Sequence, residues 1–202
     1  MKPRVLLDMD GVIANFYYGF STFLNENYNC TLNPNIEPEN YPFEDWGHGI
    51  EHINFDEAVY AWLKQDGFKN LPSYDGAKEF VTKLMDTCSV YIVTARVGDW
   101  NKKFKPDVIK KIKQDTREWL EAMEIPTERL YFRHDKIPFC QENGISIMFE
   151  DKFSTALDGA KNGIHTVLMD RGYNGSQINR FRIYRVFSFD EALNQLEKMI
   201  KQ

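Results

Sequence analysis

Short apolar runs alternate with helical patterns along most of the chain. The runs at residues 5–7, 89–93, 145–149 and 165–169 are rich in β-branched or apolar residues and stand next to polar ones. Apolar residues recur at helical spacing over 76–85, 108–123, 153–161 and 189–200. Buried strands that alternate with helices predict an α/β fold, with a doubly wound parallel sheet and right-handed crossovers.

One segment interrupts this alternation. Phe16, Phe20 and Phe23 recur at helical spacing after the first strand, and a loop with three prolines follows. A second amphipathic pattern then carries Val59 and Trp62. Helical spacing on both sides of a proline-rich loop predicts a small helical unit without strands. We therefore expect a core formed by residues 1–14 and 75–202, and a helical lid formed by residues 15–74.

Charge and composition exclude several classes of protein. The net charge is −5, with 30 acidic against 25 basic residues, which argues against binding a nucleic acid polymer. No apolar run approaches the roughly 20 residues that a membrane-spanning helix needs, and acids interrupt the first apolar run too early for a signal peptide. We expect a cytoplasmic protein with no membrane partner. Three widely spaced cysteines indicate neither a disulfide framework nor a zinc site.

Polar side chains stand where the predicted strands end. In a parallel sheet the carboxyl ends of the strands share one edge, and ligands bind there. These residues are Asp8 and Asp10 after the first strand, Thr94 after the second, Glu150 and Asp151 after the third, and Lys136 in the loop before the third.

This set of side chains suits phosphoryl transfer. Crowded carboxylates favour a hard cation such as Mg²⁺, which binds one or two carboxylates and a substrate phosphate. One carboxylate can then attack phosphorus, and a second can protonate the leaving oxygen and activate water. Lys136 and Thr94 would hold the phosphoryl oxygens. Two simpler interpretations stand beside this one: Asp10-Gly11 as an ordinary turn, and Glu150 and Asp151 as caps of the next helix.

Four motifs of the sequence resemble those of the haloacid-dehalogenase-like superfamily: DMDGV, VTAR, the lysine of HDK and the acidic pair of FED. The dehalogenases of that superfamily have no acid at the place of Asp10, and its ion-pumping ATPases have a threonine there. Because Asp10 is an acid, the resemblance implies a phosphatase or a phosphomutase. It makes Asp8 the nucleophile and Asp10 the general acid/base. It further implies Thr94, Ala95 and Lys136 as phosphate-binding residues, Mg²⁺ ligands from Asp8, Asp151 and the backbone carbonyl of Asp10, and Glu150 as a support behind the ligands.

The predicted lid is aromatic, and aromatic faces stack on planar bases. The pattern W-x5-F-x2-L before Gly76-Ala77, together with a late GYN, resembles the 5′(3′)-deoxyribonucleotidases. In that family aromatic residues line a pocket for the base. The resemblance implies such a pocket here, while the alternative is that these rings form the lid's own core. The rings concerned are Phe16, Trp46, Trp62 and Phe68.

The sequence thus predicts a Mg²⁺-dependent phosphomonoester hydrolase that acts on nucleoside monophosphates through an aspartyl-phosphate, and the resemblance implies a 5′(3′)-deoxyribonucleotidase. The rivals are a phosphatase or phosphomutase of another small metabolite such as a sugar phosphate, and a non-catalytic phosphate-binding homologue. Lys152 and Gly172 stand where the family often has arginine and proline, which leaves the preferred sugar and base open. We expect a monomer or homodimer with a small-molecule nucleotide substrate. The lysine-rich stretch 102–113 is interpreted as a solvated helix face, with a role in steering substrate left open.

Overall fold

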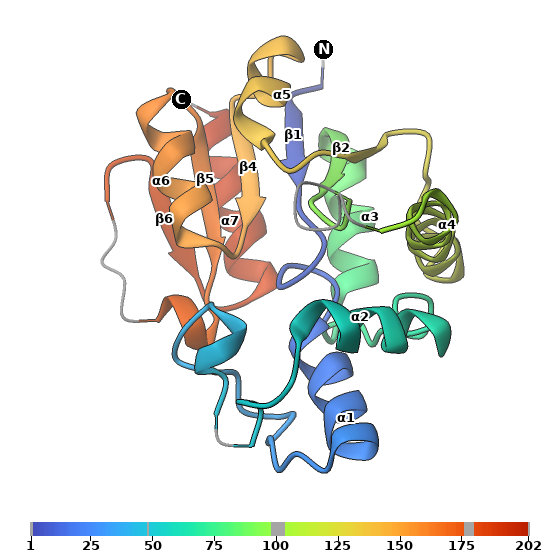
Figure 1. Cartoon of the computed structure of the whole chain (residues 1–202). Coiled ribbons are helices and arrows are strands. Elements are labelled where there is room, and N and C mark those ends of the chain that lie inside the picture. The colour runs from blue at the N-terminus through green and yellow to red at the C-terminus, as the bar shows by residue number, and fades with distance from the viewer. Residues whose placement is uncertain (1, 48, 98–103, 176–179, 202) are drawn as a thin grey trace.

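A six-stranded parallel sheet forms the centre of the computed structural model, which describes residues 2–47, 49–97, 104–175 and 180–201 (Figure 1). The strand order is β3-β2-β1-β4-β5-β6, so the order reverses beside β1. The predicted doubly wound α/β fold is confirmed. The strands are β1 (Arg4–Leu7), β2 (Ser89–Thr94), β3 (Leu130–Phe132), β4 (Ile147–Glu150), β5 (His165–Met169) and β6 (Ile183–Val186).

Strand β1 lies in the middle of the sheet and is buried on both faces. Val5, Leu6 and Leu7 have no exposed surface, and the strand pairs with β2 on one side and β4 on the other. A strand that is covered on both faces is apolar throughout, which is why this run was recognisable in the sequence. The backbone N–H of Asp8 still donates to the carbonyl of Phe149, at 3.1 Å, so the first polar residue is held at the end of the sheet.

Helices cover both faces of the sheet (Figure 1). On one face, Phe80 of α3 (Ala77–Thr87) stacks on Phe189 of α7 (Phe189–Ile200), with ring centroids 4.6 Å apart. On the other face, Phe139 of α5 (Lys136–Glu142) packs in one cluster with Leu6 and Met148, and α6 (Phe153–Lys161) lies beside α5. The two clusters use alternate residues of β1, as the pleat of a strand requires.

Among the described residues, two strands and one α-helix were not predicted from the sequence. Strands β3 and β6 form the two edges of the sheet, and α5 lies between β3 and β4. Our placement of Lys136 in a loop was wrong, because it is the first residue of α5. The Asp135 side chain caps this helix by accepting from the Ile137 N–H at 3.3 Å, and Pro138 is tolerated because it lies in the first turn.

Residues 15–74, which we call the lid, contain α1 (Phe16–Tyr28), the short helix η1 (Phe43–Asp45) and α2 (Phe55–Lys64). Asn15 and Asn54 cap α1 and α2 with their side chains, as residues before a helix commonly do. Ala14 and Ser73 form an isolated bridge, so the chain leaves the core and returns to it at one place. In Figure 1 the lid helices lie beyond the carboxyl end of β1.

Helix α4 (Pro106–Ala122) carries Lys110, Lys111 and Lys113 of the lysine-rich stretch, and Lys105 directly precedes the helix. Lys111 bridges Asp66 of the lid, at 2.6 Å, and Asp115 of α4, at 3.0 Å. Lys102 and Lys103 lie outside the described residues. Among the helices that the structure describes, none has the length and apolar character needed to cross a membrane.

Candidate active site

Four charged side chains meet where β1 and β4 end. The Lys136 Nζ lies 2.6 Å from Asp8 Oδ2 and 2.7 Å from Glu150 Oε2. Asp151 follows Glu150 directly, and all four residues are buried. Convergence of parallel strand ends brings Asp8 and Glu150 together, while the first turn of α5 aims the amine at both. One ammonium therefore faces three carboxylates in a space shielded from water.

Burial changes the protonation of this cluster. Burial raises the pKa of Asp8 to about 7, although the Lys136 ammonium opposes the shift. Burial and the charge of Asp8 raise the pKa of Asp151 to about 7, against the hydrogen bond from Tyr173. Burial disfavours the charged amine of Lys136, but Asp8 and Glu150 outweigh it and hold its pKa above the usual range. The cluster is therefore short of positive charge.

These residues fit a hard cation. Asp8, Glu150 and Asp151 each offer a carboxylate oxygen, and the three ligand atoms lie within 4.8 Å of one another. Oxygen ligands of this kind suit Mg²⁺. Gly11 leaves room beside them, because a Cβ at that position would come within 2.2 Å of Asp151 Oδ2 and 2.5 Å of the Tyr173 hydroxyl. Its φ of +75° also lies in the region that favours glycine.

We expect Gly11→Ala to weaken metal binding by about 10- to 100-fold, because the added methyl group would displace the Asp151 carboxylate. The left-handed backbone adds a stability loss of about 1–2 kcal/mol. Titration of Mg²⁺ and thermal unfolding would measure the two effects. Gly49→Ala is the matched control, since Gly49 also has a positive φ (+91°) but meets no atom within 4 Å. Equal metal affinities in both variants would contradict the prediction.

Asp10 faces an arginine instead of the metal cluster. Arg96 Nε donates to Asp10 Oδ2 at 2.9 Å, and Arg96 Nη2 donates to Asp10 Oδ1 at 2.6 Å. Arg96 lies two residues beyond Thr94, whose hydroxyl oxygen accepts from the Arg96 N–H at 3.2 Å. The end of β2 therefore supplies a two-pronged contact that fixes both oxygens of the Asp10 carboxylate.

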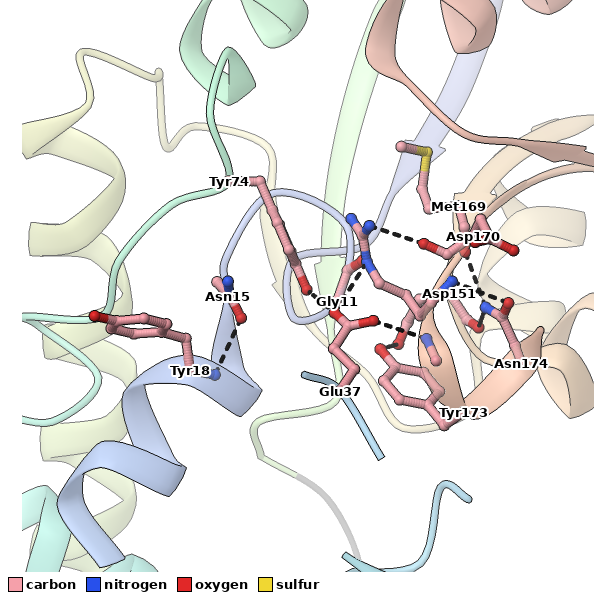
Figure 2. A network of polar contacts seen from close by, with 12 residues as sticks. Gly11, Asn15, Tyr18, Glu37, Tyr74, Asp151, Met169, Asp170, Tyr173 and Asn174 are labelled. Atoms are coloured by element: carbon pink, nitrogen blue, oxygen red, sulfur yellow. Dashed lines mark hydrogen bonds and ion pairs between the residues drawn. The ribbon is translucent and has the colours of Figure 1, made fainter. Parts of the chain in front are cut away.

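A second set of contacts supports Asp151 from the side of β5, and Figure 2 shows it. The Tyr173 hydroxyl donates to Asp151 Oδ2 at 2.5 Å, and Asn174 Nδ2 donates to the Asp151 carbonyl at 2.6 Å. Both belong to the short helix η3 (Gly172–Asn174). Glu37 of the lid accepts from the Gly172 N–H and from the Tyr74 hydroxyl, each at 2.8 Å. The lid loop is thus tied to the element that orients Asp151.

A cavity of about 490 Å³ opens onto these groups, a volume in the usual range for small-molecule sites. Its charged end comprises Asp8, Asp10, Ala95, Arg96, Lys136, Glu150 and Asp151. Its other end is aromatic and comes largely from the lid, with Phe16, Tyr17, Phe43, Trp46, Phe55 and Phe68. Tyr41 also lines the cavity but lies near the charged end, with its ring centroid 5.5 Å from that of Tyr173. The site can therefore hold a molecule that is anionic at one end and planar and apolar at the other.

Two of the predicted residues lie behind the lining of the cavity. Thr94 is fully buried, and Ala95 takes the place beside the cavity. Trp62 is packed among other rings, at 5.5 Å from Phe16 and 5.1 Å from Phe68 between centroids. The other predicted site residues line the cavity. The catalytic and binding roles assigned to them stay predictions.

Sequence reasoning gave no role to Arg96, Tyr41 or Glu37. Arg96 belongs to the quoted VTAR stretch, and an arginine directly after a buried strand was a usable signal, because arginine is rarely buried without a partner. Tyr41 and Glu37 lie in the proline-rich loop of the lid, where the sequence has no periodicity to show which side chains face the core.

A family model and a curated relative both identify this chain as similar to nucleotidases. The model of the family described as "5' nucleotidase, deoxy (Pyrimidine), cytosolic type C protein" matches residues 2–201. A curated nucleotidase from Clostridium acetobutylicum is 22% identical over 208 residues, which cover 98% of this chain and 96% of the relative.

Solved structures with the same fold are haloacid-dehalogenase-type hydrolases. One from Deinococcus radiodurans, with bound phosphate and sodium, has a TM-score of 0.64 at 14% identity and covers 98% of this chain and 96% of its own. Another from Bacillus subtilis, bound to magnesium, has a TM-score of 0.55 at 15% identity, with 96% and 98% covered. At these identities the likeness concerns the fold.

Proposed function

This chain belongs to the 5′ nucleotidase family of the cytosolic, deoxy (pyrimidine) type, and we propose that it hydrolyses nucleoside monophosphates, deoxynucleotides foremost. It is a phosphatase of the nucleotidase class. In the proposed reaction an aspartyl-phosphate forms on Asp8, with Mg²⁺ as cofactor. The observation that carries the proposal is a single cavity with a carboxylate–lysine cluster at one end and lid aromatics at the other. The same geometry supports the division of residues 1–14 and 75–202 as catalytic core and 15–74 as lid.

Asp8 is the group best placed to attack phosphorus. A carboxylate oxygen of Asp8 forms the new bond to phosphorus while the bond from phosphorus to the ester oxygen breaks, and Asp10 gives that leaving oxygen a proton. In the second half, the Asp10 carboxylate takes a proton from water, the water oxygen bonds to phosphorus, and the bond to Asp8 breaks. The products are the nucleoside and inorganic phosphate, and both aspartates return to their starting state.

The neighbouring groups prepare this exchange. Lys136 orients Asp8 through its 2.6 Å contact and balances the phosphoryl charge. Asp8 and Asp151, with the Asp10 carbonyl, would hold Mg²⁺, and Glu150 would hold Lys136 in place or act as a further ligand. The bound cation would supply positive charge to the phosphoryl oxygens and ease the repulsion between the carboxylates. The lid would exclude bulk water during the reaction.

The aromatic end supports a nucleoside as the leaving group. Phe16, Trp46 and Phe68 line it, and Phe16 lies 6.3 Å from both other rings between centroids. Such faces stack on a planar base without needing a particular base edge. Sugars present no comparable planar surface, so the shape of this end favours nucleotides over sugar phosphates.

The proposal is tested by phosphate release from ribo- and deoxynucleoside monophosphates and from sugar phosphates, with Mg²⁺ and with EDTA. We expect release from nucleotides, with deoxynucleotides the better substrates, and none in EDTA. Release confined to sugar phosphates would keep the catalytic cluster and reject a nucleoside at the lid. Release from no phosphomonoester would favour the non-catalytic phosphate-binding alternative.

Phe16→Leu is expected to raise KM for nucleotides about tenfold, because it removes one stacking face that is worth about 1–3 kcal/mol. Inhibition by inorganic phosphate, which does not reach the aromatic end, should be unchanged. Steady-state kinetics with both ligands measure this. Phe187→Leu, at an exposed phenylalanine away from the cavity lining, is the control. An unchanged KM in Phe16→Leu would place the base elsewhere.

The stabilisation by Mg²⁺ is expected to grow as the pH rises through about 7. Asp8 and Asp151 have pKa values of about 7, above their usual 3.8, so their contribution to stability in the metal-free protein is full at low pH and is lost as the pH rises through 7. Mg²⁺ binds the ionised carboxylates and competes with protons below that pH. Thermal unfolding with Mg²⁺ and with EDTA, from about pH 5 to about pH 8, should show that the gap between the two Tm values widens as the pH rises. A gap that is constant with pH would contradict the prediction.

A further inference from the structure

Arg96 is held on three sides at the end of β2. Its guanidinium makes the two-pronged contact with Asp10, donates through Nη1 to Thr116 Oγ1 of α4 at 3.3 Å, and stacks on the Phe68 ring with 4.7 Å to the centroid. Only 1% of the Arg96 side chain is exposed, against 27% of the Asp10 side chain. The arginine is thus fixed by the protein, while the carboxylate that it grips faces the cavity.

The contact leaves Asp10 able to exchange a proton. An ionised carboxylate has about four lone-pair sites on its two oxygens, and the guanidinium uses one on each oxygen. A site on each oxygen therefore remains, and Asp10 lines the cavity beside Asp8. Two parallel bonds to a planar fork also prevent rotation of the carboxylate, so that the direction of the free sites is set.

We propose that Arg96 is a positioning residue that aims the Asp10 carboxylate at the leaving oxygen and then at the attacking water. The inference rests on the proposed function, because it needs Asp10 as the proton carrier. Arg96 does not contact the reacting phosphoryl group in this role. Its effect is confined to the two proton transfers, which involve the ester oxygen and the hydrolytic water.

The lid takes part in this arrangement through Phe68. The same ring lines the cavity, covers the guanidinium of Arg96 and packs on Trp62 at 5.1 Å between centroids. A base stacked at the aromatic end therefore bears on the ring that holds Arg96 in place. Seating of the nucleoside and orientation of the proton carrier share one side chain.

Arg96→Lys tests the proposal, because lysine keeps the charge but cannot form the two-pronged contact. We expect kcat for nucleotides to fall about 100-fold or more, the usual contribution of general acid–base catalysis. In Asp10→Asn kcat should fall at least as far. The kcat of the double variant should be no lower than that of Asp10→Asn alone, because both substitutions disable the same function. Arg117→Lys is the matched control: Arg117 is an exposed arginine over the Phe132 ring, and its replacement should leave kcat within about twofold.

An aryl phosphate separates the two proton transfers. The leaving oxygen of p-nitrophenyl phosphate needs no proton, so Arg96→Lys should release about one equivalent of nitrophenolate quickly and then slow at the water-attack step. Inhibition by inorganic phosphate should match the wild type, which a general loss of structure would not allow. If Arg96→Lys does not fold, Arg96→Gln, which keeps hydrogen-bond donors without the fork, replaces it.

Three results would overturn the inference: kcat of the Arg96 variants within about twofold of wild type, multiplied losses in the double variant, or slow nitrophenolate release without a burst. In each of these cases an active wild type would leave the proposed function standing. A wild type that releases phosphate from neither nucleotides nor p-nitrophenyl phosphate would instead overturn the proposed function, and the inference with it.

Discussion

Asp8→Asn is expected to lower kcat for nucleotide hydrolysis by about 10⁴-fold or more, since it removes the atom that forms the bond to phosphorus. Asparagine has nearly the same shape, and its amide oxygen can still accept from Lys136 Nζ, which lies 2.6 Å from Asp8 Oδ2. Phosphate-release kinetics with Mg²⁺ measure the loss. Asp158→Asn, at an exposed surface pair with Lys161, is the control and should keep full activity.

The same variant should be at least as stable as the wild type when metal is absent. Burial raises the pKa of Asp8 to about 7, which means that its ionised form is unfavourable in the folded protein at higher pH. Asparagine carries no charge, so that penalty disappears. Thermal unfolding in EDTA at about pH 8 measures this. A large drop in stability would show that Asp8 has a structural role beyond the reaction, and undiminished kcat would remove it as nucleophile.

The central strands could be predicted, whereas the edge strands could not. Strands β1, β2, β4 and β5 have neighbours on both sides, so they are apolar runs. Strand β3 has three residues, all half-buried, and β6 contains Tyr184 and Arg185 between two buried residues. An edge strand pairs on one side only, and its mixture of apolar and polar residues looks like a loop in the sequence.

The position of the site could be predicted from the topology, but the contacts between the lid and the core that support the site could not. Asp8, Glu150 and Lys136 meet because parallel strands end at one edge of the sheet. The contact between Glu37 and Gly172 joins residues 135 positions apart, and no local pattern encodes such a pairing. It depends on how the lid loop settles on the core, where a Cβ at position 172 would come within 2.8 Å of the Glu37 carbonyl.

The lid aromatics show the limit of helical spacing. Phe16 and Trp62 both fall on the apolar sides of amphipathic helices, yet Phe16 lines the cavity and Trp62 does not. Trp62 is enclosed by the rings of Phe16, Phe20 and Phe68. A period of 3.6 residues identifies the buried face of a helix, but that face covers both the lid's own core and the cavity wall. The packing of the other lid segments around each helix decides which ring meets the cavity.

Lys136→Met is expected to damage both stability and activity, because Lys136 is the amine that joins Asp8 and Glu150. Methionine fills much of the space of the lysine stem but leaves two buried carboxylates without their cation. Removal of one partner from a buried ion pair destabilises a protein by about 3–5 kcal/mol. Loss of a group that stabilises the reacting oxygens lowers kcat by about 10²- to 10³-fold. Denaturant unfolding and phosphate release measure the two effects.

The dependence on metal and pH distinguishes this explanation from simple loss of packing. Without Lys136 the cluster is more negative, so Mg²⁺ should restore more stability to Lys136→Met than to the wild type. Lower pH should also restore stability, because protonated Asp8 and Glu150 no longer need the amine. Lys161→Met, which breaks an exposed pair with Asp158, should change stability little under any of these conditions. If neither Mg²⁺ nor lower pH restores the stability of Lys136→Met, the lysine stabilises the fold through its stem and not through its charge.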